Sequence, residues 1–204
     1  MDALLSTFIV LFVVVDPIGL SPMFIALTRG MDRARQRHQA IRGTILAGGI
    51  LLAFFFTGDA LLRVLGIGLP AFRIAGGILL FLLAIDMIFA RRSGLRSTTV
   101  REQAEAAAKA DVSVFPLAFP LIAGPGALTT VLLMANARSS AFEFVGMLAL
   151  LLLVLGMTLV SLLSAPLIMR LLGETGANVI SRLLGLVLAA LAVQFVLDGI
   201  RESF

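Results

Sequence analysis

The sequence predicts an all-α integral membrane protein with six transmembrane helices. Of its 204 residues, 60% are hydrophobic and only 14% are charged, and the mean hydropathy is +1.09. Soluble domains are usually about 45–50% apolar and about 25% charged. The charges gather in short clusters between apolar stretches long enough to cross a bilayer as helices. An outer-membrane barrel would instead show alternating segments of about 10 residues.

The positions of the charged clusters define the expected spans, which cover residues 4–28, 42–62, 66–90, 112–136, 143–169 and 178–199. The first span is expected to stay in the membrane, because Asp2 stands where a signal peptide would be positively charged. The connections at 29–42 and 91–111 are rich in arginine. Basic connections favour the cytoplasmic side, so both termini are expected to be periplasmic. The net charge of +4 is attributed to these loops rather than to nucleic-acid binding.

The two halves of the chain resemble each other. Three matches occur in the same order at offsets of 107, 109 and 108 residues: RVLG at 63–66 with RLLG at 170–173, RIAG at 73–76 with RLLG at 182–185, and Pro17 with Pro125. A half with three spans has an odd number of crossings, so its copy enters from the opposite side. The single membrane domain, 1–204, is therefore expected to contain two inverted three-helix repeats, 1–90 and 112–204, joined by a cytoplasmic linker at 91–111. Chance similarity among apolar helices is the alternative.

Spans one and four are each predicted to be broken. The stretch VVVDPIGLSPMF at 13–24 contains Asp16-Pro17 and Ser21-Pro22, and both pairs are typical of helix starts. The stretch FPLAFPLIAGPGALTTVLLM at 115–134 contains Gly124-Pro125-Gly126. Irregular backbone at membrane depth persists only where protein or a water-filled cavity satisfies its polar groups. The two breaks are therefore expected to face each other, with simple proline kinks as the alternative.

A substrate site is predicted at the two breaks. Each second half-helix would present free N–H groups and the positive end of its dipole, which suit a carboxylate. The free carbonyls that end each first half-helix can accept from an ammonium group. A small zwitterionic amino acid fits such a site. The expected substrate-binding residues are Asp16, Pro17, Ile18, Gly19, Gly124, Pro125, Gly126 and Thr129. Asp16 is either a structural cap or a direct ligand of substrate or proton.

The other intramembrane charges, Asp86, Arg73 and Arg182, are expected to pair between helices or to take part in ion coupling. The chain has no cysteine and one histidine, and it contains neither a P-loop nor an HExxH motif. We therefore expect no enzyme activity, no metal site and no cofactor. Transport would be driven by an ion gradient or by the substrate's own gradient. The expected partners are the substrate and the lipid bilayer, and the oligomeric state is left open, a homo-oligomer included.

These motifs resemble the MarC family of bacterial inner-membrane proteins, which is related to the LysE-type exporter superfamily. The resemblance rests on DPIG with Pro22 and Phe24, GIGLPAFRIAGGILLF at 66–81, PLAFPLIAGPGALTT at 116–130 and SRLLGLVLAALAVQFVLDGI at 181–200. It implies six transmembrane helices and transport of small neutral amino acids such as glycine or alanine, coupled to protons or sodium. Leu20 stands where many members have Asn, so the substrate preference can differ. The alternatives are export of another small solute and a non-transporting membrane scaffold or accessory protein.

Overall fold

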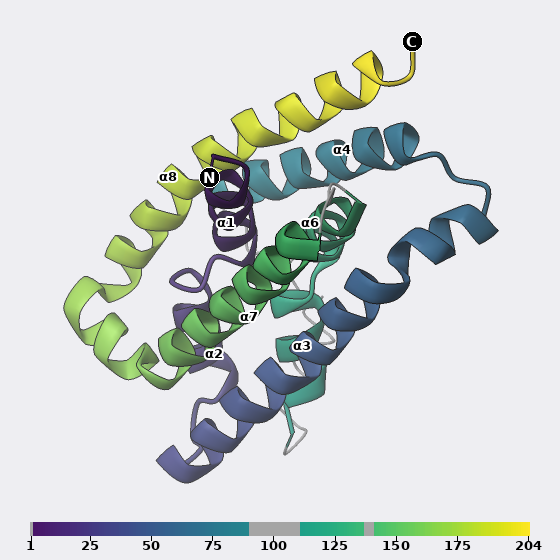
Figure 1. The fold of residues 1–204 in the computed structure, drawn as a ribbon. Coiled ribbons are helices and arrows are strands. Elements are labelled where there is room, and N and C mark those ends of the chain that lie inside the picture. Colours follow the sequence, from purple (N-terminus) through teal and green to yellow (C-terminus); the bar gives the residue numbers. More distant parts are fainter. Residues whose placement is uncertain (1, 90–110, 137–140) are drawn as a thin grey trace.

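The protein is helical throughout the part that the structure, a computed structural model, describes: residues 2–89, 111–136 and 141–204. No β-strand occurs in these ranges. The elements, in chain order, are α1 (Asp2–Val15), α2 (Leu20–Leu27), α3 (Arg33–Val64), α4 (Leu69–Ile88), the distorted segment η1 (Ser113–Ile122), α6 (Pro125–Asn136), α7 (Ala141–Leu163) and α8 (Ala165–Arg201). Figure 1 shows how these helices are arranged in space. The predicted all-α class is confirmed.

Five segments are long and apolar enough to cross a membrane: Leu4–Leu27, α3, α4, α7 and the Thr175–Arg201 part of α8. A sixth results if η1 and α6, which are bent by 59° relative to each other, count as one span. This agrees with a six-span protein. The linker expected at 91–111 lies outside the described residues except for Asp111.

Two boundaries differ from the prediction. Helix α3 begins at Arg33 rather than near 42, because the side chain of Asp32 caps it by accepting from Arg35 N at 2.7 Å. The basic stretch thus extends the helix beyond its apolar part instead of forming a loop. Span five ends at Leu163 rather than 169. A new helical segment follows, and the chain turns again at Gly173, whose φ of 67° suits glycine.

Helices α4 and α8 lie side by side and run antiparallel (Figure 1). Their backbones approach closely at two glycines. A Cβ on Gly77 would lie 2.8 Å from the Ala192 carbonyl oxygen, and one on Gly185 would lie 3.2 Å from the Ala84 carbonyl oxygen. Both pairs of equivalent residues, Gly77 with Gly185 and Ala84 with Ala192, are 108 positions apart, as are Pro17 and Pro125. The reciprocal contact agrees with an inverted repeat, which stays a prediction.

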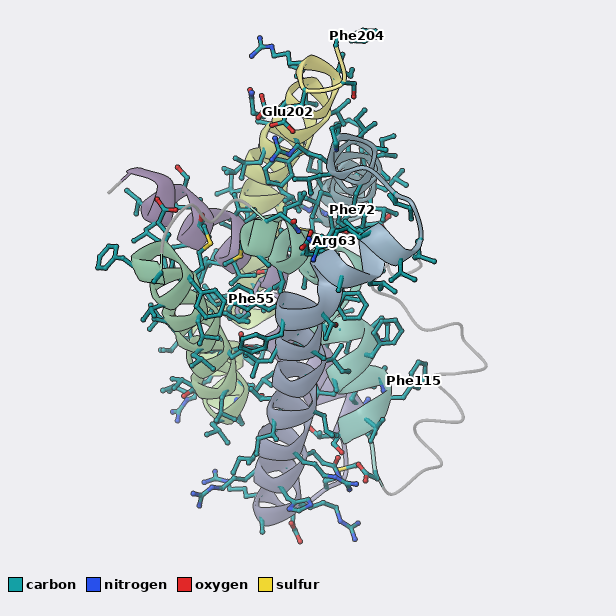
Figure 2. All side chains as sticks on the ribbon, turned by 45° about the vertical axis from the view of Figure 1, so that its right-hand side comes forward. Phe55, Arg63, Phe72, Phe115, Glu202 and Phe204 are labelled. Atoms are coloured by element: carbon teal, nitrogen blue, oxygen red, sulfur yellow. The ribbon has the colours of Figure 1, made fainter. Side chains whose placement is uncertain are left out.

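The centre of the molecule is occupied by α1 and α6. Nine of the twelve α6 residues are buried, and the last part of α1, from Val13 to Val15, is at most 3% exposed. A helix that is apolar on all sides is expected in such a position. The outer helices instead present large apolar side chains outward, such as Ile45, Phe142 and Leu171. Figure 2 shows that most of the side-chain atoms along the helices are carbon. Both interruptions of the chain therefore lie among the innermost helices.

Candidate functional site

The first interruption lies between α1 and α2, and Asp16 organises it. Asp16 has a φ of 49°, in the left-handed region that aspartate tolerates better than most residues. Its side chain accepts from Gly19 N at 3.0 Å through Oδ1 and from the Ser181 hydroxyl of α8 at 3.0 Å through Oδ2. The residue is only 2% exposed. Asp16 thus both shapes the turn and joins it to α8.

A second serine, on α7, binds the same interruption. The Ser161 hydroxyl donates to the Pro17 carbonyl oxygen at 2.7 Å, and its oxygen lies 3.1 Å from the Ser21 hydroxyl oxygen. The carbonyl oxygen of Pro17, one of the expected substrate-binding residues, therefore already has a hydrogen-bond donor. The prediction that Ser21 caps a helix that starts at Pro22 is wrong, because α2 begins two residues earlier, at Leu20, after Gly19. Ser21 lies within the first turn and contacts α7.

Sequence reasoning missed Ser161 and Ser181 as partners of this interruption. A signal was available, because each is a hydroxyl residue inside a long apolar helix, where hydroxyl groups commonly bind across helices. That signal does not reveal the partner, since Ser161 and Pro17 are 144 residues apart.

The second interruption lies between η1 and α6. In η1, Phe115 and Phe119 have extended backbone angles, as expected for residues that precede proline. Helix α6 begins at Pro125, and its first backbone hydrogen bond runs from Leu128 N to Gly124 O at 3.0 Å. The N–H groups of Gly126 and Ala127 therefore have no acceptor within the helix. A Cβ on Gly124 would lie 2.4 Å from the Pro120 carbonyl oxygen, so only glycine fits there.

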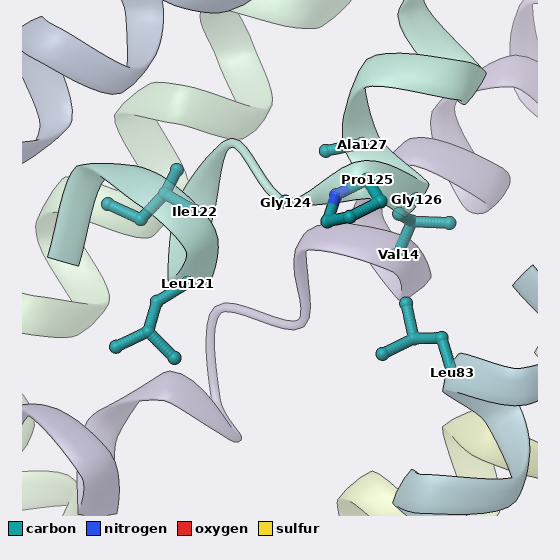
Figure 3. Close-up of a pocket in the computed structure, with 8 residues that line it drawn as sticks. All are labelled: Val14, Leu83, Leu121, Ile122, Gly124, Pro125, Gly126 and Ala127. Carbon is teal, nitrogen blue, oxygen red and sulfur yellow. The ribbon is translucent and has the colours of Figure 1, made fainter. Parts of the chain in front are cut away.

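A small cavity adjoins the start of α6. Its volume is about 10 Å³, and it is lined by Val14, Leu83, Leu121, Ile122, Gly124, Pro125, Gly126 and Ala127. Figure 3 shows Leu121 and Ile122 on one side of the Gly124 backbone and Val14 with Leu83 on the other. A space of this size holds about one water molecule. The site is therefore nearly closed, and it combines apolar side chains with free backbone donors.

The structure brings together only some of the predicted site residues. Gly124, Pro125 and Gly126 line one cavity with Val14, which lies two residues before Asp16, so the two interruptions are neighbours. Asp16 and Pro17 are bound by the serines of α8 and α7, and none of the residues Asp16–Gly19 lines this cavity. Thr129 packs against α4, where a Cβ on Gly76 would lie 2.0 Å from its methyl carbon.

The three predicted charges do not form one group. Arg73 pairs with Glu202 at the end of α8, near the C-terminus in Figure 2. Asp86 is half-buried on α4, and Arg182 is exposed on α8. Within the described ranges, no three residues of the metal-binding types His, Cys, Asp and Glu cluster closely enough to hold a metal ion.

Taken together, several apolar spans and a buried central helix that begins at an interruption of the chain define a multi-pass integral membrane protein. The chain belongs to the MarC family, because the model of the "MarC family integral membrane protein" matches residues 1–204.

Similar proteins come from archaea and bacteria. A membrane protein of Methanocaldococcus jannaschii is 40% identical over 95% of this chain and 93% of its own length. The inner membrane protein YhgN of Escherichia coli is 36% identical over 98% of both chains. The membrane protein YvbG of Bacillus subtilis is 35% identical over 98% of this chain and 95% of its own. No solved structure matches the chain.

Proposed function

We propose that this protein is a secondary transporter of the bacterial inner membrane that moves small neutral amino acids, such as glycine or alanine, by alternating access. The observation that carries the proposal is the start of α6. There the N–H groups of Gly126 and Ala127, which have no acceptor within the helix, adjoin a cavity among the innermost helices. Broken helices with exposed N-terminal N–H groups are the usual way in which transporters hold the anionic end of a substrate.

The chemistry of the cavity favours a small zwitterion. The substrate carboxylate would bind the N–H groups of Gly126 and Ala127, where the helix dipole also favours negative charge. Val14 and Leu83 would contact the substrate side chain and exclude large ones. Asp16, next to this cavity through Val14, is the proposed partner of the ammonium group or of a coupling proton or sodium ion.

The nearly closed cavity also supports alternating access. At about 10 Å³ it does not hold an amino acid, so a bound substrate requires the helices around it to separate. In the proposed cycle the two halves of the molecule rock against each other and expose the site to one side at a time.

Binding is tested first, by thermal unfolding of detergent-purified protein with glycine, L-alanine, L-serine, L-leucine or ethylamine. A ligand at 100 times its dissociation constant stabilises the folded state by about 2.7 kcal/mol. Glycine and alanine are expected to raise the melting temperature, whereas ethylamine, which lacks the carboxylate, is not. Absence of a shift with every amino acid, with and without sodium, would contradict the proposal.

A matched pair of variants locates the binding. A Cβ on Gly126 would lie 3.0 Å from Leu80 and Leu83 and 3.3 Å from Val14, so Gly126→Ala fills the cavity with little displacement of flexible side chains. The variant Gly156→Ala adds the same methyl group where nothing lies within 4 Å. We expect Gly126→Ala to lose the amino-acid-dependent shift and Gly156→Ala to keep it. Flux into liposomes then follows with the same two variants.

A further inference from the structure

The hydroxyl of Thr44, on α3, has an unusual environment. The residue is 7% exposed, and its Oγ1 has no hydrogen-bond partner among the residues that the structure describes. Four other threonines donate to the carbonyl four residues earlier, at 2.7–2.9 Å: Thr28 at the end of α2, and Thr57, Thr130 and Thr158 within helices. A buried hydroxyl without a protein partner points to a water molecule or a polar solute as its partner.

The neighbours of Thr44 place it at the seam between α3, η1 and α7. A Cβ on Gly43 would lie 2.5 Å from Leu117 of η1, and one on Gly48 would lie 3.3 Å from Leu155 of α7. The buried side chains of α3 around Thr44 are small, namely those of Ala40, Gly43, Ala47 and Gly48. Leu117 and Leu155 fill the space beside these small residues, so a solute could pass here only if η1 or α7 moved away from α3.

Segment η1 reaches the cavity at the start of α6. Segment η1 follows α3 from Ser113, and its last residues, Leu121 and Ile122, line that cavity. The first part of η1 lies at the opposite end, where Val112 N donates to the Gln39 side chain at 3.1 Å. Segment η1 therefore extends from the basic end of α3 to the candidate substrate site.

Polar contacts hold the start of η1 against the basic end of α3. Arg42 forms an ion pair with Asp111, and Asp111 accepts from Ser113 N at 3.0 Å and from the Ser113 hydroxyl at 2.6 Å. The hydrogen bond from the Ser113 hydroxyl, aided by Arg42 and His38, lowers the pKa of Asp111, so the pair stays charged at neutral pH. Outside these contacts lies an open groove of about 480 Å³, lined by Asp32, Ala34, Arg35, His38, Gln39, Arg42 and Asp111.

We propose that solute passes between this groove and the α6 cavity along the α3–η1 seam, that Thr44 lines the passage, and that the Arg42–Asp111 and Gln39–Val112 contacts form its gate. This inference rests on the proposed transport function. In it, α3 lines the route by which solute reaches the site, whereas the two helix interruptions form the site itself.

Cysteine accessibility tests the passage directly, because the chain contains no cysteine. Single variants Thr44→Cys and Ile45→Cys are treated, in permeabilised membranes, with a permanently charged methanethiosulfonate, and unreacted thiols are counted by maleimide gel shift after denaturation. Ile45 is the matched control, since it neighbours Thr44 but is 66% exposed on the outer face of α3, which we expect to face lipid. Thr44→Cys is expected to react and Ile45→Cys to stay unreactive.

The gate is tested by adding Arg42→Ala to both variants. We expect the reaction of Thr44→Cys to become about five-fold faster, which corresponds to the roughly 1 kcal/mol upper value of an exposed ion pair. The Ile45→Cys rate is expected to stay unchanged. If Thr44→Cys does not fold, Ala47→Cys, one turn further along the same buried face, takes its place.

The passage is refuted if Thr44→Cys, or Ala47→Cys in its place, reacts no faster than Ile45→Cys. It is also refuted if adding Arg42→Ala leaves the reaction rate of that buried cysteine unchanged. Labelling needs no substrate, so its outcome is independent of solute identity. Labelling as expected, with no protection by any amino acid, would retain the passage and contradict the proposed substrate instead.

Discussion

Replacing Gly19 by alanine is expected to destabilise the protein strongly. The backbone angles of Gly19, φ −66° and ψ −21°, suit any residue, so the cost arises from space alone. The new Cβ would lie 2.1 Å from Asp16 Oδ2 and 2.4 Å from the Ser181 hydroxyl oxygen. The carboxylate would have to move and lose its hydrogen bond from Ser181. Hydrogen bonds to charged groups contribute about 1.5–3 kcal/mol, and with the added repulsion we expect a loss on the order of 3 kcal/mol.

Thermal unfolding in detergent, followed by size-exclusion chromatography of the heated protein, measures this loss. For a chain of this size, 1 kcal/mol corresponds to about 2–4 °C, so Gly19→Ala should melt about 6–12 °C below the parent. The matched control is Gly49→Ala, where nothing lies within 4 Å of the new methyl group. Alanine is favoured over glycine inside a helix by about 0.5–1 kcal/mol, so this control should melt at or above the parent temperature. Equal melting temperatures for the two variants would refute the role of Asp16 as the centre of a tightly packed turn.

Three further results are expected. Ser181→Ala should lower the free energy of unfolding by about 1.5–3 kcal/mol, less than Gly19→Ala does, because it removes one hydrogen bond without adding a steric overlap. The melting temperature of the Ser181→Ala variant measures this loss. Asp16→Asn keeps an acceptor for Gly19 N and should fold. If Asp16 carries the coupling proton, the pH dependence of flux disappears in this variant. A pH dependence that persists in Asp16→Asn would exclude that role. The pKa of Asp111 is lowered from its ordinary value of 3.8 in the folded state, so its contribution to stability is full above that value and declines as the pH falls further. The melting temperature of Asp111→Asn should therefore lie below that of the parent at neutral pH and approach it below pH 3.8; a constant difference would contradict the assignment.

The sequence was sufficient for the features that depend on local chemistry. Composition and the spacing of charged clusters predict the membrane class, because long apolar stretches have few other stable environments. Helix α6 begins at Pro125, within the Gly124-Pro125-Gly126 stretch that predicts an interruption of span four. Helix α1 ends at Val15, directly before the Asp16-Pro17 pair.

Features that depend on contacts between distant residues were not predictable in this way. The serines that bind the first interruption are far from it in sequence, and only the packing of α7 and α8 brings them there. The partner of Arg73 is Glu202 rather than an aspartate within a span. Periodicity describes which side of a helix is apolar, but it contains no information on which polar groups meet across two helices.

The way in which the two interruptions are bound has a consequence for biosynthesis. The turn in the first span is completed by Ser161 and Ser181, and the start of η1 is held by Gln39 and Arg42 of the first half. Each half of the chain thus supplies the partners of the other. A ribosome makes the first span long before the serines that complete it, so the Asp16 turn stays unfinished until the last two helices have entered the membrane. The part of the protein that is synthesised first is therefore among the last to reach its final structure.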